Sequence, residues 1–344
     1  MSLFLLCIWL EFKKIMIKRK GWILVLCSML LQIAIVLNAH HNLNSFDTNL
    51  YRQYTTMFQG VYSEETKQAI INEKESVDQF MSGQQATLDS EAEMDLVNRM
   101  ILANEQSNAL RALINKYQAL ESCREWNPVL SYDIELSEYI EAYHFNWAAM
   151  LFIIVWIPLL ILGDYNCGMD QILFPSRMGQ TRLMRAKMCI GCLISITITI
   201  VMTAIQWAFF TMRWDFGQLD IPIQSLSGFE TSHVQCSIAQ CIFIGGILRV
   251  FAVIALVFLL CILSAWIRKE AITITIAASI IICSAIGFSK YANLSALSIY
   301  ATLSGAAAFK HLDANGEIIL LVSLFLKVLL YGVTAKKLLA RKRQ

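Results

Sequence analysis

The residues best suited to do chemistry lie between positions 164 and 187, where charged side chains flank a short apolar stretch. Asp164 follows one long apolar run, and Lys187 precedes the next. Between them, residues 169–174 predict a short apolar helix, which is followed by a Pro-Ser-Arg break and a basic helix that enters the bilayer. Such a short apolar helix is a good docking element for another protein, because both of its ends are anchored. An ordinary basic loop between two membrane helices is the alternative. The basic residues of the segment are Arg177, Arg182, Arg185 and Lys187.

Signatures of known catalytic sites are missing from the sequence. There is no G-x-x-x-x-G-K-[ST] phosphate loop, no H-E-x-x-H zinc motif and no G-x-S-x-G nucleophile turn. The apolar runs also lack paired carboxylates and a nucleophile beside a base, which disfavours an enzyme acting within the membrane. We therefore predict a protein that is not itself catalytic and needs no cofactor. If it uses ATP, a separate subunit must bind it.

The histidines and cysteines do not have the spacing of a metal site. His40, His41 and His144 flank the first two apolar runs, where a metal site is conceivable, but polar residues at a membrane surface explain them better. Cys189 and Cys192 form a C-x-x-C at the start of an apolar run, where packing is the better explanation. No metal is assigned.

Two basic residues fall inside apolar runs, where a charge is costly and often functional. For Lys327 we expect that the side chain reaches toward the membrane surface or pairs with another helix. Arg249 is expected at the outer interface of the membrane. Neither has an acidic residue in a neighbouring run, so a structural role is preferred for both.

The composition requires lipid as part of the solvent. Of the 344 residues, 57% are hydrophobic and 16% charged, and a soluble chain of this length has too little interior to hide so much apolar surface. A helix that crosses about 30 Å of hydrocarbon needs roughly 20 apolar residues. We therefore predict an all-α integral membrane protein with six transmembrane helices. The six runs are residues 21–38, 146–163, 188–212, 238–267, 271–288 and 318–335.

The distribution of charge predicts the orientation, because basic residues are enriched on the cytoplasmic side of membrane helices. Residues 1–20, 164–187 and 268–270 and the tail 336–344 are all net basic and belong on one side if there are six spans. Residues 39–145 instead carry 17 acidic and 7 basic residues. We predict that both chain ends are cytoplasmic and that residues 39–145 form an extracellular domain of a plasma-membrane protein.

The segments between the predicted spans have expected structures of their own. Residues 1–20 are expected to form an amphipathic helix on the inner membrane surface, with Leu5, Trp9, Phe12 and Met16 on one face. A simple basic membrane stop is the alternative. Residues 213–237 are expected to form an extracellular loop. Residues 289–317, rich in Ser and Ala, are expected to be extracellular or re-entrant rather than a seventh span.

The acidic region 39–145 has the pattern of a helical hairpin. Ser63, followed by Glu64 and Glu65, is a plausible helix start. Apolar residues then recur at helical spacing on either side of a polar turn at residues 83–89. The residues expected in the hairpin core are Ile70, Val77, Phe80, Met81, Met94, Val97, Ile101, Leu110, Leu113, Ile114, Tyr117 and Leu120.

The sequence resembles the permease subunits of type-2 ABC transporters, with a large extracellular insert like those of Gram-positive members. In that family an acid is followed by a glycine, a short apolar helix, a Gly/Arg element and an Ala-Lys pair before the third span. The residues that match in order are Asp164, Gly168, Ile172, Leu173, Gly179, Arg182, Ala186 and Lys187. The chain departs from the family in having Asp164 where glutamate is usual and in the longer spacing between Gly179 and Arg182.

The resemblance implies a function and a set of partners. A permease of this class pairs with a second permease subunit, identical or different, and with a separate ATPase subunit, and it exports a lipid, a peptide or a drug-like compound. The 164–187 segment, including Arg177 and Arg185, would then contact the ATPase. Membrane lipid is a further partner, and nucleic acid is not. The alternative function is a multi-span sensor or receptor whose extracellular domain detects a signal.

Overall fold

The protein is described by a computed structural model, and helices make up nearly all of its regular structure. It divides into two compact units: a helix bundle of residues 1–39, 142–213 and 242–344, and a hairpin domain of residues 40–141 and 214–241. The residues that the structure describes are 3–18, 20–39, 46–84, 93–143, 145–166, 177–289, 298–310 and 316–341.

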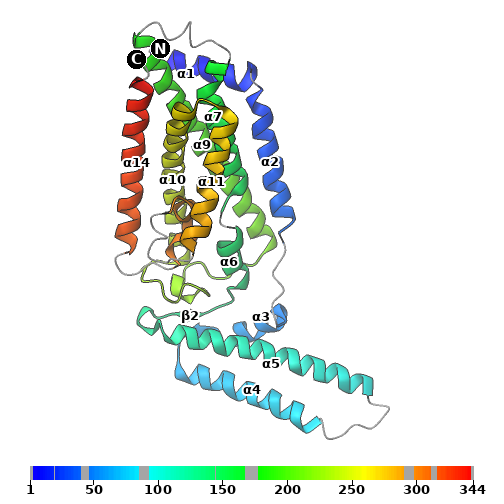
Figure 1. The fold of residues 1–344 in the computed structure, drawn as a ribbon. Helices are drawn as coiled ribbons and strands as arrows, with labels where there is room; N and C mark the ends of the chain where they lie inside the picture. Colours follow the sequence, from blue (N-terminus) through cyan, green and yellow to red (C-terminus); the bar gives the residue numbers. More distant parts are fainter. Residues whose placement is uncertain are drawn as a thin grey trace. The chain divides into compact units, whose positions relative to one another are not determined.

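The helix bundle consists of long apolar helices that run side by side (Figure 1). Three stretches are long and apolar enough to cross a membrane: Trp147–Asp164, Leu183–Arg213 and Ile238–Ile267. The prediction of apolar helices long enough to cross a membrane is therefore confirmed at these three positions. The long helices of the bundle are α2 (Gly21–Leu37), α7 (Trp147–Asn166), α9 (Arg177–Arg213), α10 (Ile238–Ile267), α11 (Glu270–Ser289) and α14 (Gly316–Arg341).

The other predicted spans correspond to shorter or bent helices. Residues 5–18 and 21–37 qualify as a span only when taken together, and the two parts are bent by 69°. Glu270–Ile286 and Ile319–Ala335 are apolar helices of 10–17 residues. Among the described residues, the structure thus contains three or four candidate spans.

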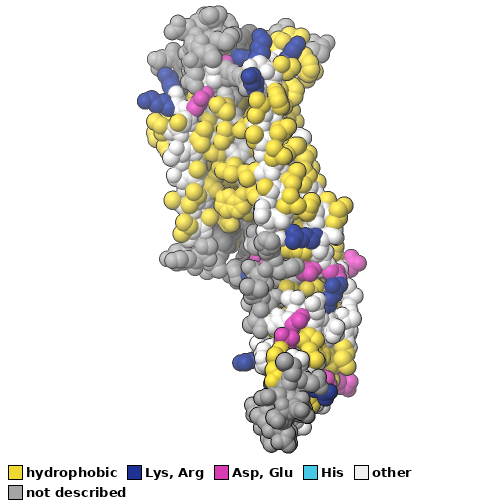
Figure 2. Space-filling model, turned by 90° about the vertical axis from the view of Figure 1, so that its right-hand side faces the viewer, with side chains coloured by type: hydrophobic (Ala, Val, Ile, Leu, Met, Phe, Trp, Pro, Cys, Tyr) yellow, Lys and Arg dark blue, Asp and Glu magenta, His cyan; other side chains and the backbone are white. Residues whose placement is uncertain are grey.

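The N-terminal segment is helical, as predicted. It consists of α1 (Leu3–Lys13) and the π-helical turn η1 (Lys14–Lys18), and the chain bends before α2 where Lys20 adopts a left-handed conformation with φ 54°. The bend directs α1 across the end of the bundle (Figure 1). On the face drawn in Figure 2, hydrophobic side chains cover the bundle, and most of its visible Lys and Arg side chains lie at one end.

Helix α9 is longer than the predicted third span. It begins at Arg177, so residues 177–187, predicted as a basic helix entering the bilayer, are helical and form its first turns. Good helix formers occupy these turns, and no proline interrupts them. Asp164 likewise lies inside α7 rather than in a loop. The short helix predicted at residues 169–174 lies outside the described residues.

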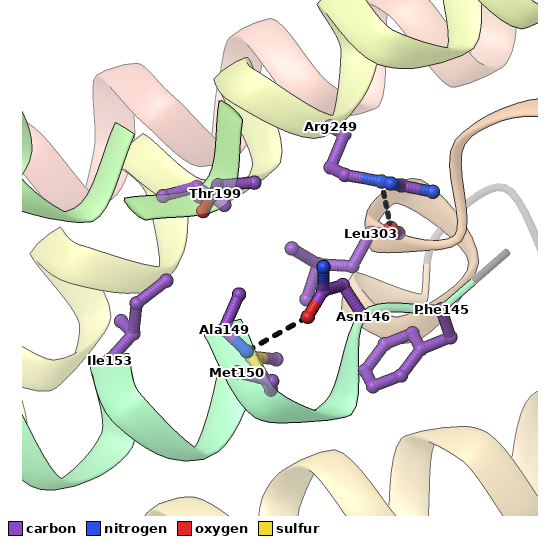
Figure 3. A pocket seen from close by; sticks show the side chains of 9 residues that line it. Phe145, Asn146, Ala149, Met150, Ile153, Thr199, Arg249 and Leu303 are labelled. Atoms are coloured by element: carbon purple, nitrogen blue, oxygen red, sulfur yellow. Dashed lines mark hydrogen bonds between the residues drawn. The ribbon is translucent and has the colours of Figure 1, made fainter. Parts of the chain in front are cut away.

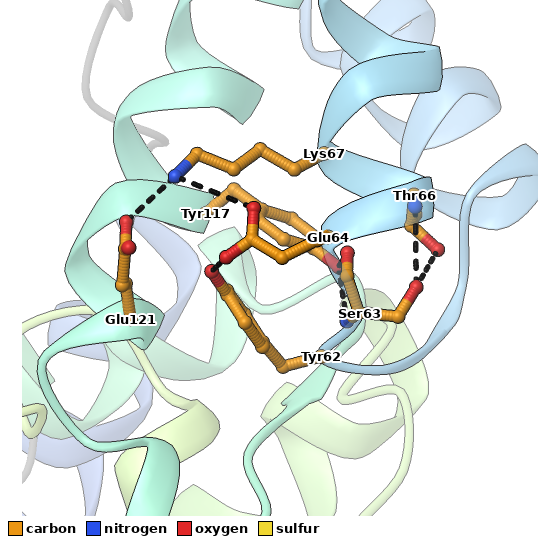
Figure 4. A network of polar contacts seen from close by, with 7 residues as sticks. All are labelled: Tyr62, Ser63, Glu64, Thr66, Lys67, Tyr117 and Glu121. Carbon is orange, nitrogen blue, oxygen red and sulfur yellow. Dashed lines mark hydrogen bonds and ion pairs between the residues drawn. The ribbon is translucent and has the colours of Figure 1, made fainter.

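The hairpin domain is built on two long antiparallel helices, α4 (Glu64–Gln84) and α5 (Glu93–Glu121). Ser63 starts α4 as predicted, since its Oγ accepts a hydrogen bond from the Thr66 amide at 3.1 Å. The Tyr117 hydroxyl joins the two helices at this point, because it donates to the Ser63 carbonyl at 2.8 Å (Figure 4). Lys67 adds an ion pair with Glu121 across the hairpin at 2.8 Å.

Shorter elements close the base of the hairpin. Strand β1 (Gly60–Val61) pairs antiparallel with β2 (Val129–Leu130). Asp47 starts α3 by accepting from the Asn49 and Leu50 amides. The remaining elements are α3 (Thr48–Met57), η2 (Arg124–Trp126), α6 (Ile134–Glu138), η3 (Tyr139–Tyr143) and η4 (Ile223–Ser225).

The core of the hairpin domain covers only part of the predicted stripe. Ile70, Leu110, Leu113, Tyr117 and Leu120 are fully buried, as predicted. Farther along the hairpin, Phe80 is 42% exposed, Val97 43% and Ile101 52%. These last three were predicted in the core, and the prediction is wrong because the hairpin extends beyond the elements that cover its base.

Residues 214–237, which belong to the predicted extracellular loop, are an integral part of this domain. The Ser225 hydroxyl accepts from the Val129 amide at 2.9 Å, and the Ser227 amide donates to Asp133 at 2.8 Å. Asp133 also forms a buried ion pair of 2.6 Å with Lys116. The segment thus packs against the chain that follows α5.

Candidate functional site

A network of four charged side chains lies at the end of the bundle that carries α1. Asp164, in the last turns of α7, forms ion pairs with Lys187 of α9 at 2.6 Å and with Lys14 at 2.5 Å. Lys14 also lies 3.6 Å from Glu11, one turn earlier in the chain. The network therefore joins three segments that lie far apart in the sequence.

Burial makes this network energetically important. The side chains of Asp164 and Lys187 are each only 1% exposed, and Glu11 is also buried. A charge in such surroundings is costly unless it is paired. Removing one partner of a buried ion pair typically costs about 3–5 kcal/mol, because the other charge is left uncompensated. We infer that the network holds α1 against the ends of α7 and α9.

The network changes the interpretation of two predicted docking residues. Asp164 and Lys187 face one another and are buried, so neither side chain is available to contact another protein. Arg185 is exposed on α9. Arg177, Gly179 and Arg182 lie in the first turns of α9. Gly168, Ile172 and Leu173 lie outside the described residues. The structure thus brings together Asp164 and Lys187 and adds Glu11 and Lys14, which sequence reasoning missed.

A second buried polar site surrounds Arg249 of α10 (Figure 3). Its guanidinium donates to the carbonyls of Leu303 at 3.1 Å and Ser304 at 3.3 Å, and to the Thr203 hydroxyl at 3.1 Å. The two carbonyls lie at the end of the short helix α13 (Ile299–Leu303). Arg249 is 9% exposed, so the arginine predicted at an interface is instead buried among helices.

The cavity beside Arg249 is small and partly polar. Its volume is about 20 Å³, enough for one water molecule. The Asn146 side chain accepts from the Ala149 amide through Oδ1, while its buried Nδ2 has no hydrogen-bond partner among the described residues. A single water that accepts from Nδ2 fits this cavity. The site is therefore too small for an organic substrate.

Close packing holds the segment after α13 against α10. A Cβ added to Gly245 would lie 2.4 Å from the Ala306 nitrogen, whereas a Cβ on the adjacent Gly246 would meet nothing within 4 Å. Tyr300 also stacks on Phe145 with ring centroids 4.7 Å apart. Residues 298–310, part of the segment predicted to be extracellular or re-entrant, are thus packed into the bundle.

The remaining candidate residues form no cluster. Lys327 has its Nζ buried without a hydrogen-bond partner in the described part of the chain, so the predicted pairing within the bundle is not seen there. His40, His41 and His144 lie outside the described residues. Among the residues that are described, no group of three histidine, cysteine or acidic side chains is arranged to hold a metal ion.

Comparisons with known proteins give no match, so the functional argument is based on the geometry of the structure. The sequence matches no protein-family model, and no characterised protein or solved structure matches it.

Proposed function

We propose that this chain is the membrane-spanning permease subunit of a type-2 ABC transporter, which exports a lipid, peptide or drug-like substrate. It crosses the plasma membrane six times with both ends in the cytoplasm, and its hairpin domain is extracellular. ATP is hydrolysed by a separate ATPase subunit, and a second permease subunit, identical or different, completes the pathway. The chain itself is not catalytic.

The observation that carries this proposal is the ion-pair network around Asp164. It joins the last turns of α7 to the first turns of α9 through the Asp164–Lys187 pair. Lys14 ties the N-terminal helix to the same point. Arg185 is exposed on α9, two residues before Lys187, so an ATPase that contacts Arg185 could pass a movement through this connection to both helices.

The arrangement of the bundle supports the proposed topology. The start of α1 and the end of α14 lie at the same end of the bundle (Figure 1), as an even number of spans requires. The basic turn between α10 and α11, with Arg268 and Lys269, adds to the positive charge predicted on the cytoplasmic side.

The proposal is tested by co-purification with an ATPase. The full chain should retain an ATPase subunit that carries a phosphate loop, and the complex should hydrolyse ATP faster than the ATPase alone. Arg185→Glu is expected to lower this stimulation at least ten-fold, because it reverses a charge on the proposed contact surface. Lys337→Glu reverses an exposed charge on α14 and serves as the matched control.

Two results would contradict the proposal. One is failure of the folded chain to retain any ATPase. The other is equal stimulation by the native chain, the Arg185→Glu variant and the Lys337→Glu variant.

A sensor or receptor is the second candidate, because the hairpin domain carries an open groove of about 350 Å³. Val77, Phe80 and Leu102 line it, together with Arg99. A ligand bound there would be detected without transport. Ligand binding by a chain that retains no ATPase would favour this function over the permease.

A further inference from the structure

An open apolar groove runs between the N-terminal helix and the bundle. Helix α1 contributes Leu5, Trp9 and Phe12, and helix α9 contributes Leu193, Ile194 and Thr197, with further apolar residues from both helices and from α2. The volume of the groove is about 430 Å³, within the range of about 300–1,000 Å³ for small-molecule sites. Its position follows from the 69° bend before α2, which lays α1 across the end of the bundle.

The walls of the groove remain uncovered by the chain itself. Leu5 is 52% exposed, Trp9 57% and Leu193 59%. Trp9 and Phe12 stack with ring centroids 6.3 Å apart and form one continuous apolar wall. Thr197, with its hydroxyl, and Trp9, with its indole N–H, are the lining residues that carry a side-chain oxygen or nitrogen. The groove therefore suits a flexible apolar chain rather than a polar solute.

The exposed charges beside the groove are basic. Lys13 ends α1, Lys18 ends η1 and Lys20 precedes α2, and all three are exposed. Glu11, the one acid in this part of the chain, is buried and lies 3.6 Å from Lys14. Exposed positive charge thus adjoins, along the chain, the segments that line the apolar groove, which matches the negative headgroup and apolar tail of an anionic phospholipid.

We propose that this groove binds an acyl chain of one anionic phospholipid, whose headgroup lies against Lys13, Lys18 and Lys20. The lipid fills the space between α1 and α9 and adds to the ion pairs that hold α1 on the bundle. The proposal requires that the bundle lies in a membrane. It does not depend on transport or on an ATPase.

The test is native mass spectrometry of the full chain in detergent, with added phosphatidylglycerol or with phosphatidylcholine of the same acyl chains. The native chain is expected to retain one phosphatidylglycerol molecule. Thr197→Trp should reduce its occupancy at least five-fold, because the indole ring fills the groove. Ile200→Trp places the same ring on an exposed site of α9 outside the groove and should leave the occupancy unchanged.

The headgroup contact is tested separately. Replacing Lys13, Lys18 and Lys20 with glutamine should lower the preference for phosphatidylglycerol over phosphatidylcholine, by roughly five-fold for each lysine close to the headgroup. These side chains are exposed, so the variant is expected to fold. If Thr197→Trp does not fold, Leu193→Trp fills the same groove from another exposed position.

Either of two results would overturn the proposal. One is equal phosphatidylglycerol occupancy in the groove-filling variant and the Ile200→Trp control. The other is equal retention of the two lipids by the native chain. Because the measurement uses the chain alone, neither result bears on the proposed contact with an ATPase.

Discussion

The helix bundle and the hairpin domain each bury one lysine–aspartate pair with a separation of 2.6 Å, but the two pairs have different surroundings. In the hairpin domain, Lys116 also donates to the Ser131 carbonyl at 2.6 Å, and Asp133 accepts from the Ser227 amide. Backbone groups therefore satisfy part of the hydrogen-bonding capacity of each charged side chain.

In the helix bundle, other charges take the place of those backbone groups. Asp164 lies between Lys187 and Lys14, and Lys14 lies near Glu11. Asp164, Lys187 and Lys14 each pair with a residue from another segment. The comparison indicates that the hairpin pair stabilises its own part of the chain. The bundle network instead connects several helices, and losing one of its charges is expected to disrupt the whole network.

The largest expected effect is that of Asp164→Asn. It leaves two lysines without their carboxylate, so we expect a loss of about 3–5 kcal/mol in the free energy of unfolding and the release of α1 from the bundle. Chemical unfolding in detergent measures the first effect, and protease cleavage near residue 20 measures the second.

A double replacement separates the charge from the packing at this site. Asp164→Leu combined with Lys187→Met removes both buried charges, and we expect it to recover most of the stability that Asp164→Asn loses. If Asp164→Asn has the stability and cleavage rate of the native chain, the network does not hold α1.

The next effect tests whether close packing also holds the bundle together. Gly245→Ala should destabilise the protein by about 1–3 kcal/mol, because the new methyl group meets the backbone of Ala306. Gly246→Ala, one residue away, should be neutral or should stabilise the helix by roughly 0.5–1 kcal/mol. Equal effects of the two substitutions, measured by thermal unfolding in detergent, would show that the approach of residues 305–306 to α10 is not tight.

A smaller effect is expected for Asp133→Asn in the hairpin domain. The asparagine can still accept from the Ser227 amide, and Lys116 keeps its bond to the Ser131 carbonyl. We expect a loss of about 1–2 kcal/mol, measured as the denaturant midpoint of the full chain, with no increase in cleavage near residue 20. A larger loss than that of Asp164→Asn would reverse the comparison between the two pairs.

The smallest expected effect is on the pH dependence of stability, and it concerns Cys123 of the hairpin domain. Burial, with a smaller contribution from Glu230, raises the pKa of the Cys123 thiol from 9.0 to about 11. The unfolded chain therefore loses this proton at lower pH than the folded one, so stability falls as the pH rises from about 9 to about 11. Cys123→Ala should reduce this alkaline decline, measured from denaturant midpoints at pH 8 and 10.5. An unchanged decline would show that Cys123 does not contribute to it.

Local patterns explain what could be predicted from the sequence. The start of α4 at Ser63 depends on residues within one turn, so it can be recognised from a few neighbouring residues in the sequence. The apolar runs at 147–164, 183–213 and 238–267 are equally easy to recognise from the sequence. The basic helix predicted after the Pro-Ser-Arg break is also a local pattern, and residues 177–187 are helical as the first turns of α9.

The contacts that build the candidate site have no such local pattern. Lys14 and Asp164 are 150 residues apart, and the partners of Arg249 include two backbone carbonyls, which any residue type supplies. Sequence reasoning selected Asp164 and Lys187 as candidate site residues, yet placed both on a surface that contacts another protein. Their pairing depends on how α7 and α9 pack, which their own spacing does not determine.

The most direct test of the central claim is ATP hydrolysis by the ATPase subunit bound to the chain. It is compared for the native protein, for Lys14→Met, for Asp164→Asn, and for the double variant that combines Lys14→Met with Asp164→Asn. The account predicts that each single substitution lowers the stimulation of hydrolysis and that the double variant is no worse than Asp164→Asn, because both break the same connection. Stimulation that is unchanged in both single variants, or losses that simply add in the double variant, would contradict it.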